Sequence, residues 1–315
     1  NFRHLERIIK FLLWQRGGWK IHLSGAEDLV QQLQDYYQTN TFGKFDDDVI
    51  GVKNNGHSIE VEGCAELPKK HSEARSIGRN LNGCRIGFDL GGSDRKAAAV
   101  VDGEVKFSEE IEWDPYFEPD PDYHYQGIMN SLKRAAEHLP RVDAIGGSAA
   151  GCYSHNRVTW ASLFRGVEPK LFDEKVRDMF LNISREWNVP LEVLNDGEVT
   201  ALAGSMAMGK NGVLGIAMGT SQGGGYIDMN GNITTWLSEL AFAPVDMHPN
   251  APADEWSGDL GCGAQYFSQQ AVGRLLPASG IDYDSTLKLP EQLKIVQALM
   301  EQGDERALKI YDAIG

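Results

Sequence analysis

The sequence predicts an α/β protein with two similar α/β halves, preceded by a small α+β segment. Three observations support this fold class. Segments with strand and helix spacing alternate from residue 84 onward. A strand–turn–strand pattern with paired glycines occurs twice, at Gly91-Gly92 and again at Gly223-Gly224. The chain has 315 residues, which is enough for two or three domains.

Composition and charge exclude several classes of protein. Lys and Arg number 30 against 45 Asp and Glu, and the net charge of −15 argues against broad contact with nucleic-acid phosphates. The sequence has no apolar run of about 18 residues, so we expect no membrane segment and a cytoplasmic location. The four cysteines lie far apart without a CxxC pair, which predicts neither a zinc site nor a disulfide framework.

Residues 1–83 are predicted to form the α+β segment and a connector. Apolar spacing predicts helices over residues 2–15 and 26–37, and alternation predicts a strand over residues 19–23. Residues 49–63 are expected to form two short strands around Asn54-Asn55-Gly56. The polar residues 68–82 read as the connector.

From residue 84, strands and helices follow in an order typical of α/β folds. The first half, 84–197, contains predicted strands at 85–90, 97–101, after Asp102-Gly103, 142–148 and 191–194, with helices at 127–139 and 174–187. The second half, 198–315, contains a helix at 198–208, strands at 213–218 and 226–229, and helices at 290–302 and 304–314. Since helices alone follow residue 272, the second half is expected to be incomplete.

The first chemical motif is Asp89-Leu-Gly91-Gly92-Ser93, at the end of a buried strand. Amides that no side chain obstructs can bind phosphate oxygens together with the Ser93 hydroxyl, and Asp89 can hold Mg²⁺ through water. The alternative is an ordinary hairpin turn.

The second motif is Gly219-Thr220-Ser221-Gln-Gly223-Gly224-Gly, which follows an apolar strand. It lacks the Gly-Lys-Ser/Thr of a Walker A loop, and a strand rather than a helix follows, unlike a dinucleotide fingerprint. So many glycines cost conformational entropy, which favours a phosphate-binding loop over a flexible hairpin.

The third motif, Asn195-Asp196-Gly197, joins a buried strand to a helix. The Asp196 carboxylate is placed where α/β sheets present catalytic groups, and it can accept the proton of a hydroxyl that attacks a γ-phosphate. The alternative is an N-cap aspartate.

The order of these motifs resembles that of sugar kinases in the actin, hexokinase and Hsp70 superfamily, most closely the ROK (repressor, ORF, kinase) family. The Gly219 motif is similar to the GTGxGGG form of that family, and Asn195-Asp196 matches its Asn-Asp pair. The resemblance spans about residues 84–272. It implies two ribonuclease-H-like (actin-like ATPase) domains around a cleft, ATP and Mg²⁺ as cofactors, and Asp196 as the base, with Asn195 and Asp196 contacting a sugar.

The sugar side departs from the family pattern. Ser148-Ala-Ala-Gly151 replaces a Pro-Gly turn, and Ser162 falls near the family's sugar-binding asparagine. Glu239 resembles the glutamate of Glu-x-Gly-His, with a solvated strand-end charge as its alternative.

The family's zinc cluster is also missing from the pattern. Ala241 and Phe242 stand at the glycine and histidine of Glu-x-Gly-His, and Ala264 stands at a sugar-contacting glutamate after Gly261-Cys262. We therefore expect a diverged, zinc-free substrate site.

The sequence thus predicts a kinase that transfers the γ-phosphoryl of ATP to a hydroxyl of a sugar or sugar-like polyol. The alternative is a catalytically weak sugar- or nucleotide-sensing protein on the same fold. Residues 1–83 show too few helices and no basic recognition helix for a winged-helix repressor. The sequence leaves open the sugar and the oligomeric state, including whether the protein is a homo-oligomer. A third glycine-rich motif that packs on adenosine is expected beyond residue 315.

Overall fold

The computed structural model describes residues 2–71 and 73–315, which form two compact units. Unit 1 contains residues 2–71, 216–224 and 235–315, and unit 2 contains residues 73–215 and 225–234. The first 71 residues therefore share a unit with residues 235–315. The domain boundaries predicted from the sequence, at 83/84 and 197/198, remain predictions.

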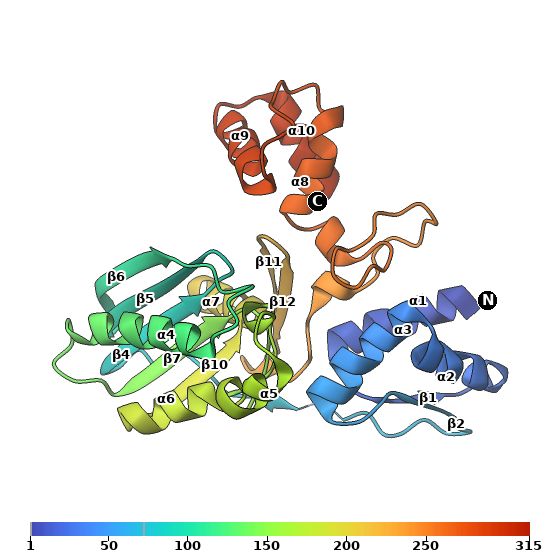
Figure 1. Cartoon of the computed structure of the whole chain (residues 1–315), viewed down its shortest axis with the longest axis horizontal. Coiled ribbons are helices and arrows are strands. Elements are labelled where there is room, and N and C mark those ends of the chain that lie inside the picture. The colour runs from blue at the N-terminus through green and yellow to red at the C-terminus, as the bar shows by residue number, and fades with distance from the viewer. Residues whose placement is uncertain (1, 72) are drawn as a thin grey trace. The chain divides into compact units, whose positions relative to one another are not determined.

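Unit 2 is built on a five-stranded sheet in the order β10-β7-β4-β5-β6 (Figure 1). The strands are β4 (Cys84–Leu90), β5 (Asp94–Val101), β6 (Glu104–Glu112), β7 (Ala144–Ala149) and β10 (Leu191–Asn195). The predicted meander is confirmed, since β4, β5 and β6 are antiparallel neighbours. β7 is parallel to both β4 and β10, with Leu90 and Asn195 each in register with Ala149. The first and third motifs therefore leave the sheet at the same edge.

Three helices cover this sheet: α4 (Pro121–Ala136), α6 (Met179–Trp187) and α7 (Asp196–Met208). α4 begins six residues earlier than predicted because the Asp120 side chain caps it by accepting from the Asp122 amide, and Pro121 fits its first turn. α6 packs Phe180 against Phe88 of β4, with ring centroids 5.9 Å apart, in the main hydrophobic core. α7 packs against β7 and β10.

A second sheet has the order β11-β12-β13-β3 and corrects one prediction. Its strands are β11 (Val213–Met218), β12 (Gln222–Ile227), β13 (Ile233–Thr234) and β3 (Ala74–Arg75). The strand predicted at 226–229 instead begins at Gln222, so the glycines at 223–225 lie in the strand and not in the loop. Their missing side chains permit close packing: a Cβ at Gly225 would lie 2.5 Å from the Glu198 Cα.

The edge strand of that sheet, β11, exposes an apolar face. Leu214, Ile216 and Met218 alternate along it and are 59%, 43% and 50% exposed. The expectation that further polypeptide completes this sheet stays a prediction.

The first part of unit 1 contains α1 (Phe2–Arg16), β1 (Lys20–Leu23), α2 (Val30–Thr39), α3 (Thr41–Asp46) and β2 (Glu60–Gly63), with β1 parallel to β2. The prediction of two strands over 49–63 is wrong, because residues 47–55 are helical and β2 alone follows. Gly56, with a left-handed φ of 74°, ends that helix and donates its amide to Val52. Asn-Asn-Gly is thus a helix end and not a hairpin turn.

The last part of unit 1, residues 269–315, is mostly helical. α8 (Gln269–Leu275), α9 (Leu289–Glu301) and α10 (Glu305–Ile314) share a small core that includes Val296 and Ile310. The last two helices are confirmed as predicted. Within the described residues, every helix is too short or too polar to cross a membrane.

Candidate functional site

The sheet edge of unit 2 holds the Asn195-Asp196 pair at the start of α7. Asn195 is the N-cap: its Oδ1 accepts from the Gly197 amide at 2.8 Å, and Glu198 completes a capping box. The alternative role of Asp196 as an N-cap is therefore wrong, since its neighbour has that role. The Asn195 Nδ2 also donates to the Gly151 carbonyl at 2.8 Å, which ties the turn after β7 to the start of α7. Asp196 is left available for chemistry.

The Asp196 carboxylate has the electrostatics of a proton acceptor. Burial raises its pKa above the ordinary aspartate value, a hydrogen bond from the Gly197 amide lowers it in part, and the charge of Asp89 raises it further. The amide of Gly197 donates to Oδ1 at 2.9 Å. A raised pKa makes this carboxylate a stronger base than an exposed aspartate, which suits general base catalysis.

Asp89, predicted to hold Mg²⁺, lies on the same edge, and its side chain is 41% exposed. The Lys96 Nζ lies 3.7 Å from Asp89 Oδ2 and also pairs with Asp94. Sequence reasoning missed Lys96, although the hairpin register that places it opposite Asp89 could have indicated it. Two nearby carboxylates, Asp89 and Asp196, fit a magnesium ion that Asp89 would hold through water.

The turn that follows Asp89 has both satisfied and free amides. The Gly91 N–H donates to the Asp94 carbonyl at 2.9 Å, and the Ser93 Oγ donates to Asp94 Oδ2 at 3.0 Å. Among the described residues, the N–H groups of Gly92 and Ser93 have no acceptor. Those two amides are the ones that fit a phosphate.

The second predicted loop is shorter than expected and lies in unit 1 (residues 219–221). Gly219, Thr220 and Ser221 are exposed, and the Gly219 N–H donates to the Ser221 carbonyl at 3.0 Å. No described residue accepts from the Thr220 amide. Gly223 and Gly224 are buried in β12, where a Cβ on Gly224 would lie 2.6 Å from the Leu240 Cδ1. Gly224 thus has a packing role, and the phosphate role of both glycines stays a prediction.

Ser162, the predicted sugar ligand of unit 2, begins a short 3₁₀ turn near Gly92 and Asp196. Tyr116 joins these residues. Its pKa is raised by burial and by Asp196, and is lowered by Arg165 and by a hydrogen bond with Ser162. A Cβ on Gly92 would lie 2.0 Å from the Tyr116 hydroxyl.

The Arg165 guanidinium lies 4.4 Å from the centre of the Tyr116 ring. Sequence reasoning missed both residues, because neither belongs to a periodic pattern. Gly92 now has a second explanation, namely room for the Tyr116 side chain.

Glu239 lies in unit 1, half-buried, just before the 3₁₀ turn Leu240–Phe242. Its backbone N–H donates to the Trp14 carbonyl at 3.0 Å. Cys262 of the same unit is fully buried, and burial raises the pKa of its thiol to about 12. Among the described residues, no group of three or more His, Cys, Asp or Glu side chains is placed to hold a metal ion, and the zinc-free substrate site stays a prediction.

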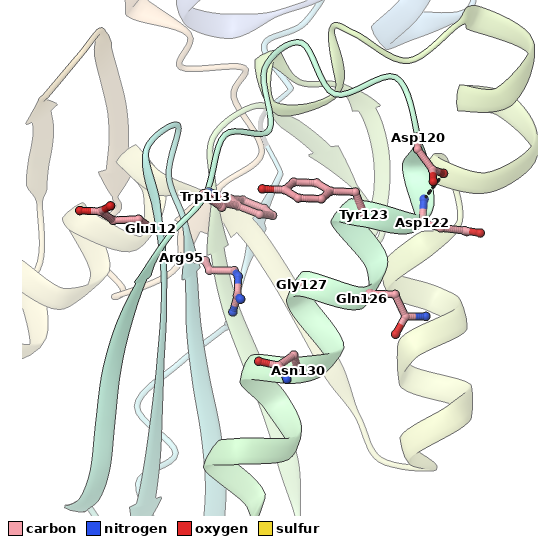
Figure 2. Close-up of a pocket in the computed structure, with 9 residues that line it drawn as sticks. All are labelled: Arg95, Glu112, Trp113, Asp120, Asp122, Tyr123, Gln126, Gly127 and Asn130. Carbon is pink, nitrogen blue, oxygen red and sulfur yellow. Dashed lines mark hydrogen bonds between the residues drawn. The ribbon is translucent and has the colours of Figure 1, made fainter.

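A pocket of about 460 Å³ lies in unit 2, and none of the predicted site residues lines it. Figure 2 shows the rings of Trp113 and Tyr123 beside the Arg95 side chain, with Gln126 and Asn130 on α4. Trp113 connects this pocket to the first turn, because its Nε1 donates to the Gly91 carbonyl at 2.8 Å.

The fold is shared with sugar kinases of known structure. A ROK family glucokinase from Streptomyces griseus, crystallised with glucose and AMPPNP, aligns with a TM-score of 0.56 and 22% identity over 74% of this chain and 75% of that one. A ROK hexokinase from Thermus thermophilus aligns with a TM-score of 0.51 and 18% identity over 73% of each chain. A ROK family transcriptional regulator, a homolog of the E. coli MLC protein, aligns with a TM-score of 0.57 and 18% identity over 73% of this chain and 59% of that one.

No protein-family model and no curated protein matches the sequence. The predicted likeness to ROK-family sugar kinases is confirmed at the level of the fold, and the predicted α/β class is confirmed by the structure.

Proposed function

We propose that this protein transfers the γ-phosphoryl group of ATP to a hydroxyl of a sugar or sugar-like polyol. The observation that carries the proposal is the position of Asp196, a partly buried carboxylate with a raised pKa at the sheet edge where Asp89 and the Gly92 turn also lie. The fold shared with a glucokinase and a hexokinase supports the same reaction class.

The roles of the residues follow from their hydrogen bonds. Asp196 Oδ1 accepts from the Gly197 amide, which leaves Oδ2 to take the proton of the acceptor hydroxyl. The free amides of Gly92 and Ser93 would bind phosphate oxygens as charge develops during transfer. Mg²⁺, held through Asp89, would neutralise charge on the phosphates. On the substrate side, Ser162 and Asn195 of unit 2 would contact the sugar, and Glu239 of unit 1 stays a predicted sugar ligand.

The alternative function, a catalytically weak sensor, draws on the likeness to a transcriptional regulator. The described part of residues 1–83 does not favour DNA binding, because β1 and β2 pair in parallel and make no antiparallel wing. An intact Asp196 favours the kinase.

Release of ADP, measured over a panel of hexoses and N-acetylhexosamines, tests the proposal. The wild-type protein should turn over at least one acceptor, and Asp196→Asn should lower kcat roughly 10²- to 10⁴-fold while nucleotide binding persists. An Asp196→Asn variant with near-normal kcat would exclude Asp196 as the base. Sugar binding without ADP release in the wild type would favour the sensor.

A further inference from the structure

The last turn of α1 hydrogen-bonds directly to the segment that carries Glu239. The carbonyls at a helix's carboxyl end have no partner within the helix. Here the Gln15 carbonyl accepts from the Ser238 amide and the Trp14 carbonyl accepts from the Glu239 amide, each at 3.0 Å. The backbone of the predicted sugar ligand is thus held by the end of a helix more than 200 residues earlier in the chain.

Aromatic packing strengthens this contact. The fully buried Trp14 ring lies 4.6 Å from Phe242 and 6.0 Å from Phe45, measured between ring centroids. The Arg16 guanidinium also lies 3.5 Å from the centre of the Trp236 ring. Both sides of the Glu239 segment therefore contact the same helical turn.

Buried ion pairs fix α1 itself. Lys10, which is fully buried, pairs with Asp46 Oδ1 at 3.0 Å and with Asp259 Oδ2 at 2.6 Å. Arg7 pairs with Asp259 at 2.8 Å, and the Trp14 indole N–H donates to Asp46 at 2.9 Å. Because a buried charge that loses its partner is strongly destabilising, this network prevents α1 from sliding relative to the loop that contains Asp259.

The backbone at the contact has an uncommon conformation. Ser238 is buried and adopts a φ of 51°, in the left-handed region that non-glycine residues rarely occupy. Such a conformation persists where its surroundings hold it. The two bonds to α1 and the Trp14 ring supply that support.

We propose that the carboxyl-terminal turn of α1 is a positioning element that holds the Glu239 backbone, so that its carboxylate is presented to the sugar. The role of Glu239 as a sugar ligand rests on the proposed function. Residues 2–71 are then an integral part of the unit that holds Glu239 and not a separable appendage. Trp14 acts through Glu239 and is a positioning residue.

The holding contact is tested first in the full chain without any ligand. Trp14→Leu removes the aromatic contact, and we expect amide hydrogen exchange at Ser238 and Glu239 to accelerate about 10-fold or more. Ile310→Ala is the control, because it creates a core lesion of comparable kind in the α8–α10 cluster of the same unit. Phe242→Leu removes the same ring contact from the other partner and replaces Trp14→Leu if that variant does not fold. Exchange that matches the Ile310→Ala control would overturn the proposal.

The consequence for the substrate is tested with the acceptor that turns over fastest in the hexose and N-acetylhexosamine panel. Trp14→Leu should raise the KM for that acceptor about 10- to 100-fold and leave the KM for ATP within about twofold, while Trp14→Phe should restore most of the loss. Glu239→Gln separates the two hypotheses. If Glu239→Gln raises the acceptor KM and Trp14→Leu does not, positioning by α1 is wrong. If Glu239→Gln has no effect, the sugar-ligand assignment fails, and the exchange result alone decides whether α1 holds the segment.

Discussion

Glu198, the half-buried carboxyl of the α7 capping box, should make the protein less stable as the pH rises. Burial raises the pKa of Glu198 from 4.5 to about 7, the hydrogen bond from the Asn195 amide and the charge of Arg75 lower it in part, and Glu192 raises it. The folded state therefore holds a proton that the unfolded state releases near pH 4.5. The resulting stability is fully present below pH 4.5 and is lost as the pH rises to about 7.

The size of this effect follows from the two pKa values. A difference of about 2.5 corresponds to an upper limit of about 3 kcal/mol, and partial solvent exposure of Glu198 reduces it to about 1–2 kcal/mol. Glu198→Gln keeps an oxygen that accepts from the Asn195 amide, now at 3.2 Å, without the charge. At pH 8 we expect this variant to be about 1–2 kcal/mol more stable than the wild type, with a smaller difference at pH 5.

Urea denaturation at both pH values measures the difference in free energy of unfolding between the variant and the wild type. Glu291→Gln is the matched control, because the exposed Glu291 carboxylate likewise accepts from the N-cap amide, that of Lys288, at the start of α9. The argument from burial would be refuted if Glu198→Gln were less stable than the wild type at pH 8. It would also be refuted if the difference in free energy of unfolding were the same at both pH values.

Three further predictions concern the base, the core and the metal content. Asp89→Asn should move the acid limb of the pH profile of kcat/KM to lower pH, because the Asp89 charge raises the pKa of Asp196. An acid limb that stays at the wild-type pH would show that the Asp89 charge does not act on Asp196. Gly147→Ala should lower the free energy of unfolding, measured by urea denaturation, by about 1–3 kcal/mol, because its Cβ would lie 1.9 Å from the Phe88 ring. Gly146→Ala is the control and should lower it by under about 0.5 kcal/mol, because a Cβ there meets open space. Equal losses in the two variants would contradict this packing. Elemental analysis of the purified, tag-free protein should find no stoichiometric zinc, and one zinc per chain would disprove the prediction.

Much of unit 2 was predictable because its signals are local. The strands β4, β5, β7 and β10 have apolar residues at strand spacing, and glycines and Asn-Asp-Gly mark where they end. Since carboxyl ends of parallel strands meet at one edge, Asp89 and Asp196 could be expected to lie together. The order of the motifs along the chain carried the likeness to sugar kinases, which the shared fold confirms.

Helix and strand boundaries were less predictable where two local conformations compete. Asn54-Asn55-Gly56 suits a hairpin turn as well as a helix end, and packing of residues 47–55 within unit 1 selected the helix. Gly223 and Gly224 suit a loop, but close neighbours such as Leu240 placed them in a strand. Local sequence cannot distinguish these cases, because the deciding contacts come from distant residues.

Local residue patterns therefore determined the fold class, the strand ends and the three motifs. Tertiary structure decided which side chains surround them: Tyr116 against Gly92, Lys96 beside Asp89, and α1 against Glu239. It also decided the roles of two residues at the start of α7, where Asn195 is the N-cap and Asp196 is not. The physical reason is range. Periodicity and turn chemistry act over a few residues and can be recognised in the local sequence. Buried ion pairs, ring contacts and backbone hydrogen bonds join segments that are distant in the sequence, and the sequence of one segment does not indicate its partner.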